Sequence, residues 1–201
     1  MTLLLTVSGQ LLLLLNALWM LKTWQPKDET PGWYAAAFCS GLLICSFSAS
    51  NLLAHVIELI PMFWFEQLAL YAAFPLLTFV LMALVARFDW PKEAWGRILL
   101  GVCGIYWVCQ QTQQLDHLLL VSSMLSVILT LRLMTLTDQL CIKQKSLLLA
   151  CSLIACLLIA YALLLDSQRM GLELGLGFLL LAINRIFWPL SKNINSQKAE
   201  Q

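Results

Sequence analysis

Charged residues are scarce in this chain of 201 residues. They make up 11% of it, whereas a soluble domain averages about 25%. Hydrophobic residues make up 61%, against a usual apolar fraction of about 45–50%. Long apolar runs recur from one end of the chain to the other, so one soluble core could not bury them. The composition therefore excludes an ordinary soluble domain and predicts an all-α, polytopic integral membrane protein.

Other features are also missing, and each absence excludes a class of protein. A formal net charge of +1 provides no basic surface for a nucleic-acid partner. The seven cysteines form no CxxC pair and most lie inside apolar runs, which indicates small hydrophobic residues rather than a disulfide framework or a zinc site. The sequence has no P-loop, GxSxG, HExxH or dinucleotide-binding motif, so no common catalytic signature is present.

Seven apolar runs predict a transmembrane domain within residues 1–190, followed by a polar cytoplasmic tail at 191–201. The predicted helices are, approximately, 3–21, 33–60, 62–86, 95–111, 117–137, 147–165 and 171–190. A span needs about 20 apolar residues, with a lower limit of about 17. The fourth run is the shortest and reaches that limit only if Trp95 and Gln111 are included.

The basic residues predict the orientation of the bundle. If all seven runs span the membrane, all basic residues except Arg169, which means eleven of the twelve, fall on one side. Lysine and arginine concentrate in cytoplasmic loops, so we expect the N-terminus outside and the C-terminus inside. The protein would be a multi-pass protein of a plasma membrane, and its compact loops fit a bacterial inner membrane.

Two features predict how the helices pack. Ser122, Ser126 and Thr130 repeat every four residues, which favours a close contact between two helices. Pro75 lies in the middle of the third run and should kink that helix, because proline removes a backbone hydrogen bond.

The predicted outer side of the bundle, which has only Arg169 as a basic residue, provides the candidate binding residues. Asn51, His55 and Glu58 follow at spacings of four and three, so they form one stripe on a helix. Ionisable groups inside membrane helices are costly and are functional candidates by default. The stripe could instead be a hydrogen-bonded packing surface. The predicted outward-facing acidic and histidine pocket comprises Asn51, His55, Glu58, Glu66, Asp116, His117 and Glu173.

The chemistry of this pocket is left open by the sequence. A corner at Pro61 would keep Glu66 near Glu58, and two close carboxylates favour a shared proton or a bound cation. His55 and His117 are the only histidines, and such a pair can bind haem or a transition metal. The ligand and any cofactor are therefore unknown.

The topology is similar to that of two seven-helix families. Microbial rhodopsins bind retinal through a lysine of the seventh helix, but here the seventh run has no lysine before Lys192, so no retinal is expected. Hydrolases of the alkaline ceramidase type carry a serine four residues before a histidine in an early helix, and a His-xxx-His pair in the last. Here Asn51 stands four residues before His55, and the seventh run has no histidine.

Three functional classes follow from these residues. The first is a small membrane sensor or binding protein with this outer pocket and a membrane or cytoplasmic protein partner. The second is a non-catalytic subunit or scaffold of a larger membrane complex. The third, with the least support, is an intramembrane enzyme that uses His55 and Glu58 for acid–base or metal chemistry, or a haem- or metal-binding protein.

Overall fold

The computed structural model describes residues 2–26, 30–54, 63–88, 90–136, 142–164 and 172–186. Within these ranges the chain is helical apart from short turns, and no strand occurs. The all-α prediction is confirmed. The labelled helices are α1 (Thr2–Thr23), α2 (Gly32–Ala54), α3 (Phe63–Leu68), α4 (Phe74–Ala86), α5 (Lys92–Gln111), α6 (Leu115–Leu136) and α7 (Ile142–Leu164), and a further helix covers 172–186.

Three of these helices are long and apolar enough to cross a membrane. They are Gly32–Ala54, Phe65–Ala86 and Leu115–Leu136, each with at least 22 residues. A helix of 20 residues spans about 30 Å, the thickness of the hydrocarbon core of a bilayer. The exposed surface supports the same conclusion, because Leu100 and Leu157 are 73% and 70% exposed. By length and composition, three helices of this protein could therefore cross a membrane.

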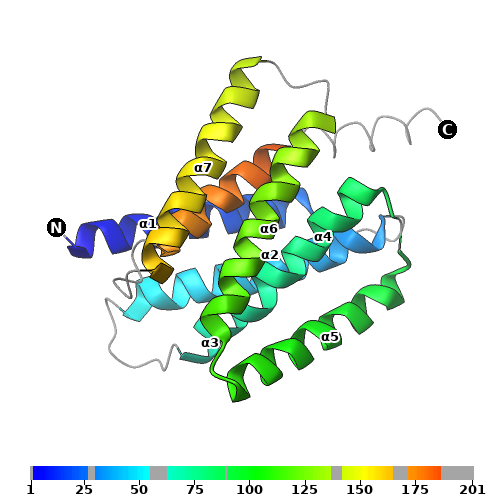
Figure 1. Ribbon diagram of the computed structural model, residues 1–201, viewed down its shortest axis with the longest axis horizontal. Coiled ribbons are helices and arrows are strands. Elements are labelled where there is room, and N and C mark those ends of the chain that lie inside the picture. Colours follow the sequence, from blue (N-terminus) through cyan, green and yellow to red (C-terminus); the bar gives the residue numbers. More distant parts are fainter. Residues whose placement is uncertain are drawn as a thin grey trace.

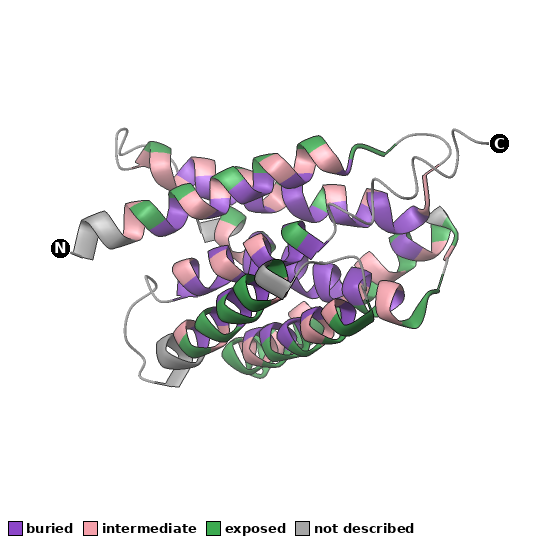
Figure 2. Ribbon diagram, turned by 90° about the horizontal axis from the view of Figure 1, so that it is seen from above, coloured by how far each residue is buried: buried purple, intermediate pink, exposed green. Residues whose placement is uncertain are grey.

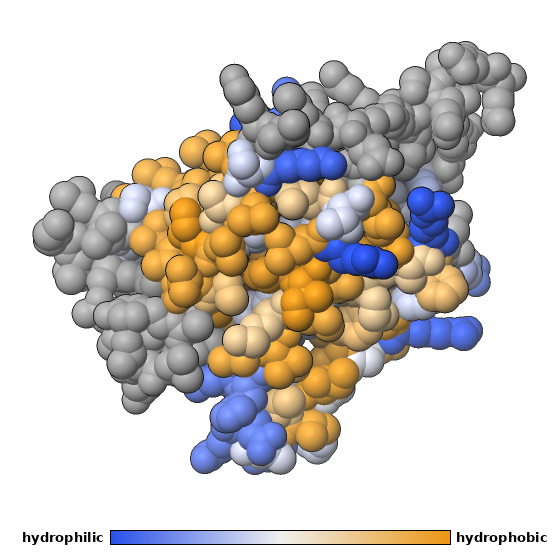
Figure 3. Space-filling view, turned by 45° about the horizontal axis from the view of Figure 1, so that its top comes forward, coloured by the Kyte–Doolittle hydropathy of each residue, from blue (hydrophilic) through white to orange (hydrophobic). Residues whose placement is uncertain are grey.

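Successive long helical stretches run in opposite directions through the molecule, with α3, η1 (Ala69–Ala73) and α4 counted as one stretch (Figure 1). The C-terminal ends of α1, α4 and α6 lie toward the same side of the molecule as the first turns of α2, α5 and α7. Buried side chains gather in the centre and exposed ones on the outward sides (Figure 2). The surface in Figure 3 is apolar across its middle, with most hydrophilic side chains nearer the edges. This distribution suits a bundle whose sides face lipid.

The third apolar run forms one continuous rod with an unusual middle. A π-helical turn, η1 (Ala69–Ala73), joins α3 to α4 directly before Pro75. The Phe74 amide donates to the carbonyl of Ala69, five residues earlier. Pro75 has no amide hydrogen, and in a regular helix its ring would clash with the carbonyl four residues before it. The wider turn accommodates the proline as a π-bulge, at the place where a kink was predicted.

The core brings α1, α2, α4 and the helix over 172–186 together, and α6 packs beside α4. At one end, the aromatic rings of Trp24 and Trp33 meet edge to face with centroids 5.3 Å apart. Nearby, Trp95 in the first turns of α5 is buried against α2, where a Cβ added to Gly32 would lie 2.6 Å from Trp95 Cδ1. This contact fixes the start of α5 to the bundle.

Candidate functional site

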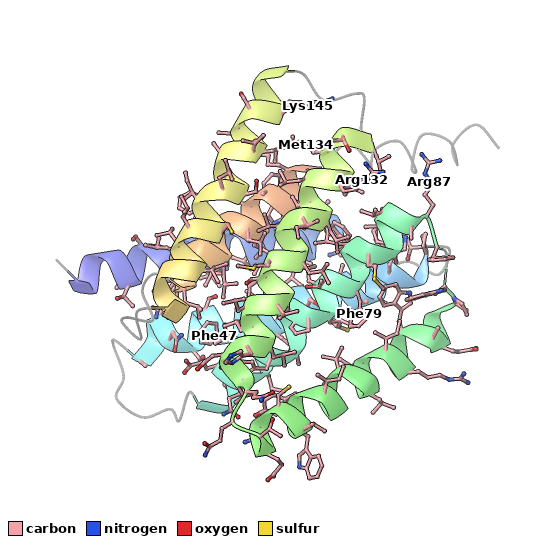
Figure 4. All side chains as sticks on the ribbon, in the orientation of Figure 1. Phe47, Phe79, Arg87, Arg132, Met134 and Lys145 are labelled. Carbon is pink, nitrogen blue, oxygen red and sulfur yellow. The ribbon has the colours of Figure 1, made fainter. Side chains whose placement is uncertain are left out.

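Basic side chains gather at one end of the bundle. Figure 4 labels Arg87, Arg132 and Lys145, which all lie toward the same end, although Arg87 is the C-cap of α4 and the other two come from α6 and α7. Lys22 lies in the last turn of α1. Arg185 lies in the last turn of the helix over 172–186, and its guanidinium carbon is 5.4 Å from the centroid of the Trp19 ring. Among the described residues, cations from five helices therefore meet at this end.

The described members of the predicted pocket lie at the opposite end. Asn51 is near the last residue of α2, and Glu66 is in the first turn of α3. Asp116 and His117 are in the first turn of α6, and Glu173 is the second residue of the helix over 172–186. His55 and Glu58 lie outside the described residues, as does the corner at Pro61.

These candidates occupy different environments. Asp116 and His117 are exposed, and Asn51 and Glu66 are partly buried. Glu173 is only 6% exposed and accepts a hydrogen bond of 3.5 Å from Nε2 of Gln10 in α1. The five described pocket residues therefore lie at one end, but Glu173 is buried in the contact between α1 and the helix over 172–186. Within the described ranges, no group of three or more His, Cys, Asp or Glu side chains could hold a metal ion.

Polar side chains continue along the contact between α1 and the helix over 172–186. Nδ2 of Asn184 donates to the backbone carbonyl of Asn16 at 2.9 Å, and Nδ2 of Asn16 donates to that of Leu12. Glycines allow this close approach, since a Cβ on Gly177 would lie 2.9 Å from Leu12 Cδ2. Gln10, Asn16 and Glu173 therefore join helices at the two ends of the chain, as buried polar groups in membranes must find partners inside the protein.

The predicted contact of the serine and threonine stripe is confirmed. Ser122, Ser126 and Thr130 are all buried, and the partner helix is α4. Thr78 Oγ1 lies 2.7 Å from Ser126 Oγ and donates a longer bond of 3.3 Å to the Ser122 carbonyl. Thr78 was not among the predicted packing residues; its signal in the sequence is a lone hydroxyl four residues after Phe74 in an otherwise apolar run.

An apolar cavity of about 170 Å³ lies between the η1–α4 rod, α5 and α6. Tyr71 and Pro75 line it from the π-turn and the start of α4, and Val102 lines it from α5. The ring of Tyr71 stacks on that of Tyr106 with centroids 5.8 Å apart, and the Tyr106 hydroxyl donates to Gln67 Oε1 at 2.5 Å. The sequence did not predict this cavity, although Pro75 marked the irregular turn beside it.

Comparison of the chain with known protein families, curated proteins and solved structures finds no match in any of the three.

Proposed function

We propose that all seven helical stretches span a plasma membrane, with the basic end in the cytoplasm and the N-terminus outside. The support is the gathering of described cations from five helices at one end, together with the alternating helix directions (Figure 1). Because lysine and arginine near the ends of spans set the orientation, this end would face the cytoplasm. Compact loops fit a bacterial inner membrane.

Within this topology the protein acts as a small membrane sensor or binding protein. The observation that supports this function is the position of Asn51, Glu66, Asp116, His117 and Glu173, which come from four helices and lie at one end. At the outer boundary the partly buried Glu66 and the exposed Asp116 and His117 attract cations or protons from the external medium. With His55 and Glu58 they would form a rim whose occupancy is passed on through a membrane or cytoplasmic partner.

The binding function can be tested by thermal melts of the purified protein across pH and with added divalent cations. A ligand that binds only the folded state raises Tm by mass action. We expect cation- or pH-dependent shifts that are reduced in His55→Ala, Glu58→Gln and Asp116→Asn. Glu93→Gln is the matched control, because Glu93 is exposed in the first turn of α5, at the basic end.

The binding function would be contradicted if the wild-type Tm does not change with pH or added cations and all three variants melt at the wild-type temperature. The stripe would then be a packing surface. An optical spectrum of the same sample tests haem separately, since haem with two histidine ligands gives a strong Soret absorption band.

The alternative function, a subunit or scaffold of a larger membrane complex, is favoured by the surface of α5. Cβ atoms added to Gly96, Gly101 or Gly104 would meet nothing within 4 Å, and small residues in membrane helices favour contact with another helix. Purification from native membranes in a mild detergent separates the two functions. A partner in constant stoichiometry supports the scaffold, and a solitary chain whose Tm responds to a cation supports the sensor.

A further inference from the structure

The cavity beside η1 lies where α5 stands away from the bundle. Trp95 holds the first turns of α5 against α2, and Tyr106 holds its other end against Tyr71 and Gln67. Between these two attachments, Val102 and Ile105 line the cavity, with Val102 buried and Ile105 exposed. Figure 4 labels Phe79 on the part of α4 that faces α5, and Phe79 lines the same cavity.

The polar atoms in the cavity wall are already satisfied by the protein. Thr78 Oγ1 donates to the Phe74 carbonyl at 3.0 Å and also contacts Ser126 Oγ. Ser122 Oγ donates to the Leu119 carbonyl at 3.0 Å. A water molecule needs two to four polar partners, and these hydroxyls are engaged elsewhere. The cavity therefore suits an apolar occupant.

The opening of the cavity faces the lipid. Four of its lining side chains are exposed on the outside of the bundle: Val121 is 60% exposed, Ile105 48%, Leu125 41% and Met82 38%. Val121 and Leu125 lie well inside α6, which is one of the three candidate spans. In the membrane topology proposed above, on which this inference rests, the medium at this depth is hydrocarbon, so the occupant would enter sideways from the bilayer and not from water.

We propose that the cavity is a binding site for one hydrocarbon chain of a membrane lipid. Its volume of about 170 Å³ is comparable to the cavity of about 150 Å³ that takes up benzene in another protein, so it admits a length of one chain and not two. The accessible surface of the cavity is apolar, so the lipid head group would stay outside it, at the membrane surface. The site lies apart from the acidic rim and does not depend on cation binding there.

The test uses the full-length protein in vesicles that contain a phosphatidylcholine with a photoreactive diazirine midway along one chain. After illumination, labelled peptides are identified by mass spectrometry. We expect labelling of Phe79, Val102 and Leu125 that saturates with probe concentration and is several-fold above that of Leu100 and Leu157, which are more exposed on the lipid-facing surface. Labelling in proportion to exposure alone would contradict the proposal.

Two variants of α5 provide a matched pair. Val102→Phe fills the cavity, whereas Val108→Phe places the same side chain on a 53% exposed position of the same helix. Saturable labelling should fall several-fold in Val102→Phe and stay unchanged in Val108→Phe. Val121→Phe narrows the opening from an exposed position and should reduce labelling even if Val102→Phe fails to fold. Unchanged labelling in Val121→Phe would overturn the proposal.

Discussion

Two regions of the bundle contain glycines in very different surroundings. Around the helix over 172–186, glycines are in close contact: a Cβ on Gly175 would lie 2.7 Å from Ile159 Cγ1, and one on Gly9 would lie 3.2 Å from Leu174 Cγ. In α5, by contrast, Cβ atoms added to Gly96, Gly101 and Gly104 meet nothing within 4 Å. The presence of glycine in an apolar helix therefore does not by itself show that another helix packs closely against it.

The difference extends to hydrogen bonding. The close region holds buried side-chain bonds between distant parts of the chain, such as Asn184 to Asn16 and Gln10 to Glu173. α5 has the Tyr106–Gln67 bond near one end and the packing of Trp95 near the other. Because van der Waals packing and interhelical hydrogen bonds hold membrane helices together, α5 should be the more easily displaced part of the bundle.

The largest effect is expected at the contact of α4 with α6. Ser126→Leu places a branched side chain where Ser126 Oγ lies 2.7 Å from Thr78 Oγ1, so the two backbones must separate. Overpacking of this kind costs about 1–3 kcal/mol, and we expect Tm in detergent to fall by several degrees. Thr135→Leu, at an exposed position of the same helix, is the control. Equal melting of both variants would mean that the α4–α6 contact is absent.

A smaller but more diagnostic effect separates the two kinds of glycine. Gly175→Ala brings Cβ within 3.1 Å of the Ala155 carbonyl oxygen as well as close to Ile159, so α7 must shift and Tm should fall. Gly104→Ala meets no atom and removes a glycine, which costs about 1 kcal/mol relative to alanine inside a helix, so Tm should stay the same or rise. The comparison fails if the two variants change Tm in the same direction.

The smallest effect concerns the attachment of α5. Tyr106→Phe removes the hydrogen bond to Gln67 but keeps the ring beside Tyr71, and a typical hydrogen bond contributes about 0.5–1.5 kcal/mol. We expect Tm to fall by a few degrees at most. A double-mutant cycle with Gln67→Leu isolates the pair. Additive changes in the free energy of unfolding would show that the two side chains do not interact.

Much of the fold could be predicted because the apolar runs are long and are separated by short polar links. Seven helical stretches occupy the predicted runs within the described residues, and the buried face of α6 followed from the spacing of its hydroxyls. Pro75 indicated an irregular helix, but a π-turn depends on how the neighbouring backbone can widen, and no residue pattern specifies that. The stretch with His55 and Glu58 lies outside the described residues, so the pocket built on it stays a prediction.

The cavity could not be predicted for a different reason. The apolar residues that line it, such as Phe79, Val102 and Leu125, have the same composition as residues that pack against another helix or face lipid. Which of these three surroundings each side chain has depends on the separation of α5 from α4 and α6, which is set by contacts at the two ends of α5. A periodic pattern of apolar residues identifies a helix face but not the distance to its neighbour.

The most direct test of the membrane topology uses a reporter enzyme that is active only in the cytoplasm. Fused after Gln201, it should be active, because the basic end is proposed to face the cytoplasm. Fused after Gln114, in the link between α5 and α6, it should be silent. An active Gln114 fusion would contradict the account, because either α5 does not span the membrane or the whole bundle has the opposite orientation.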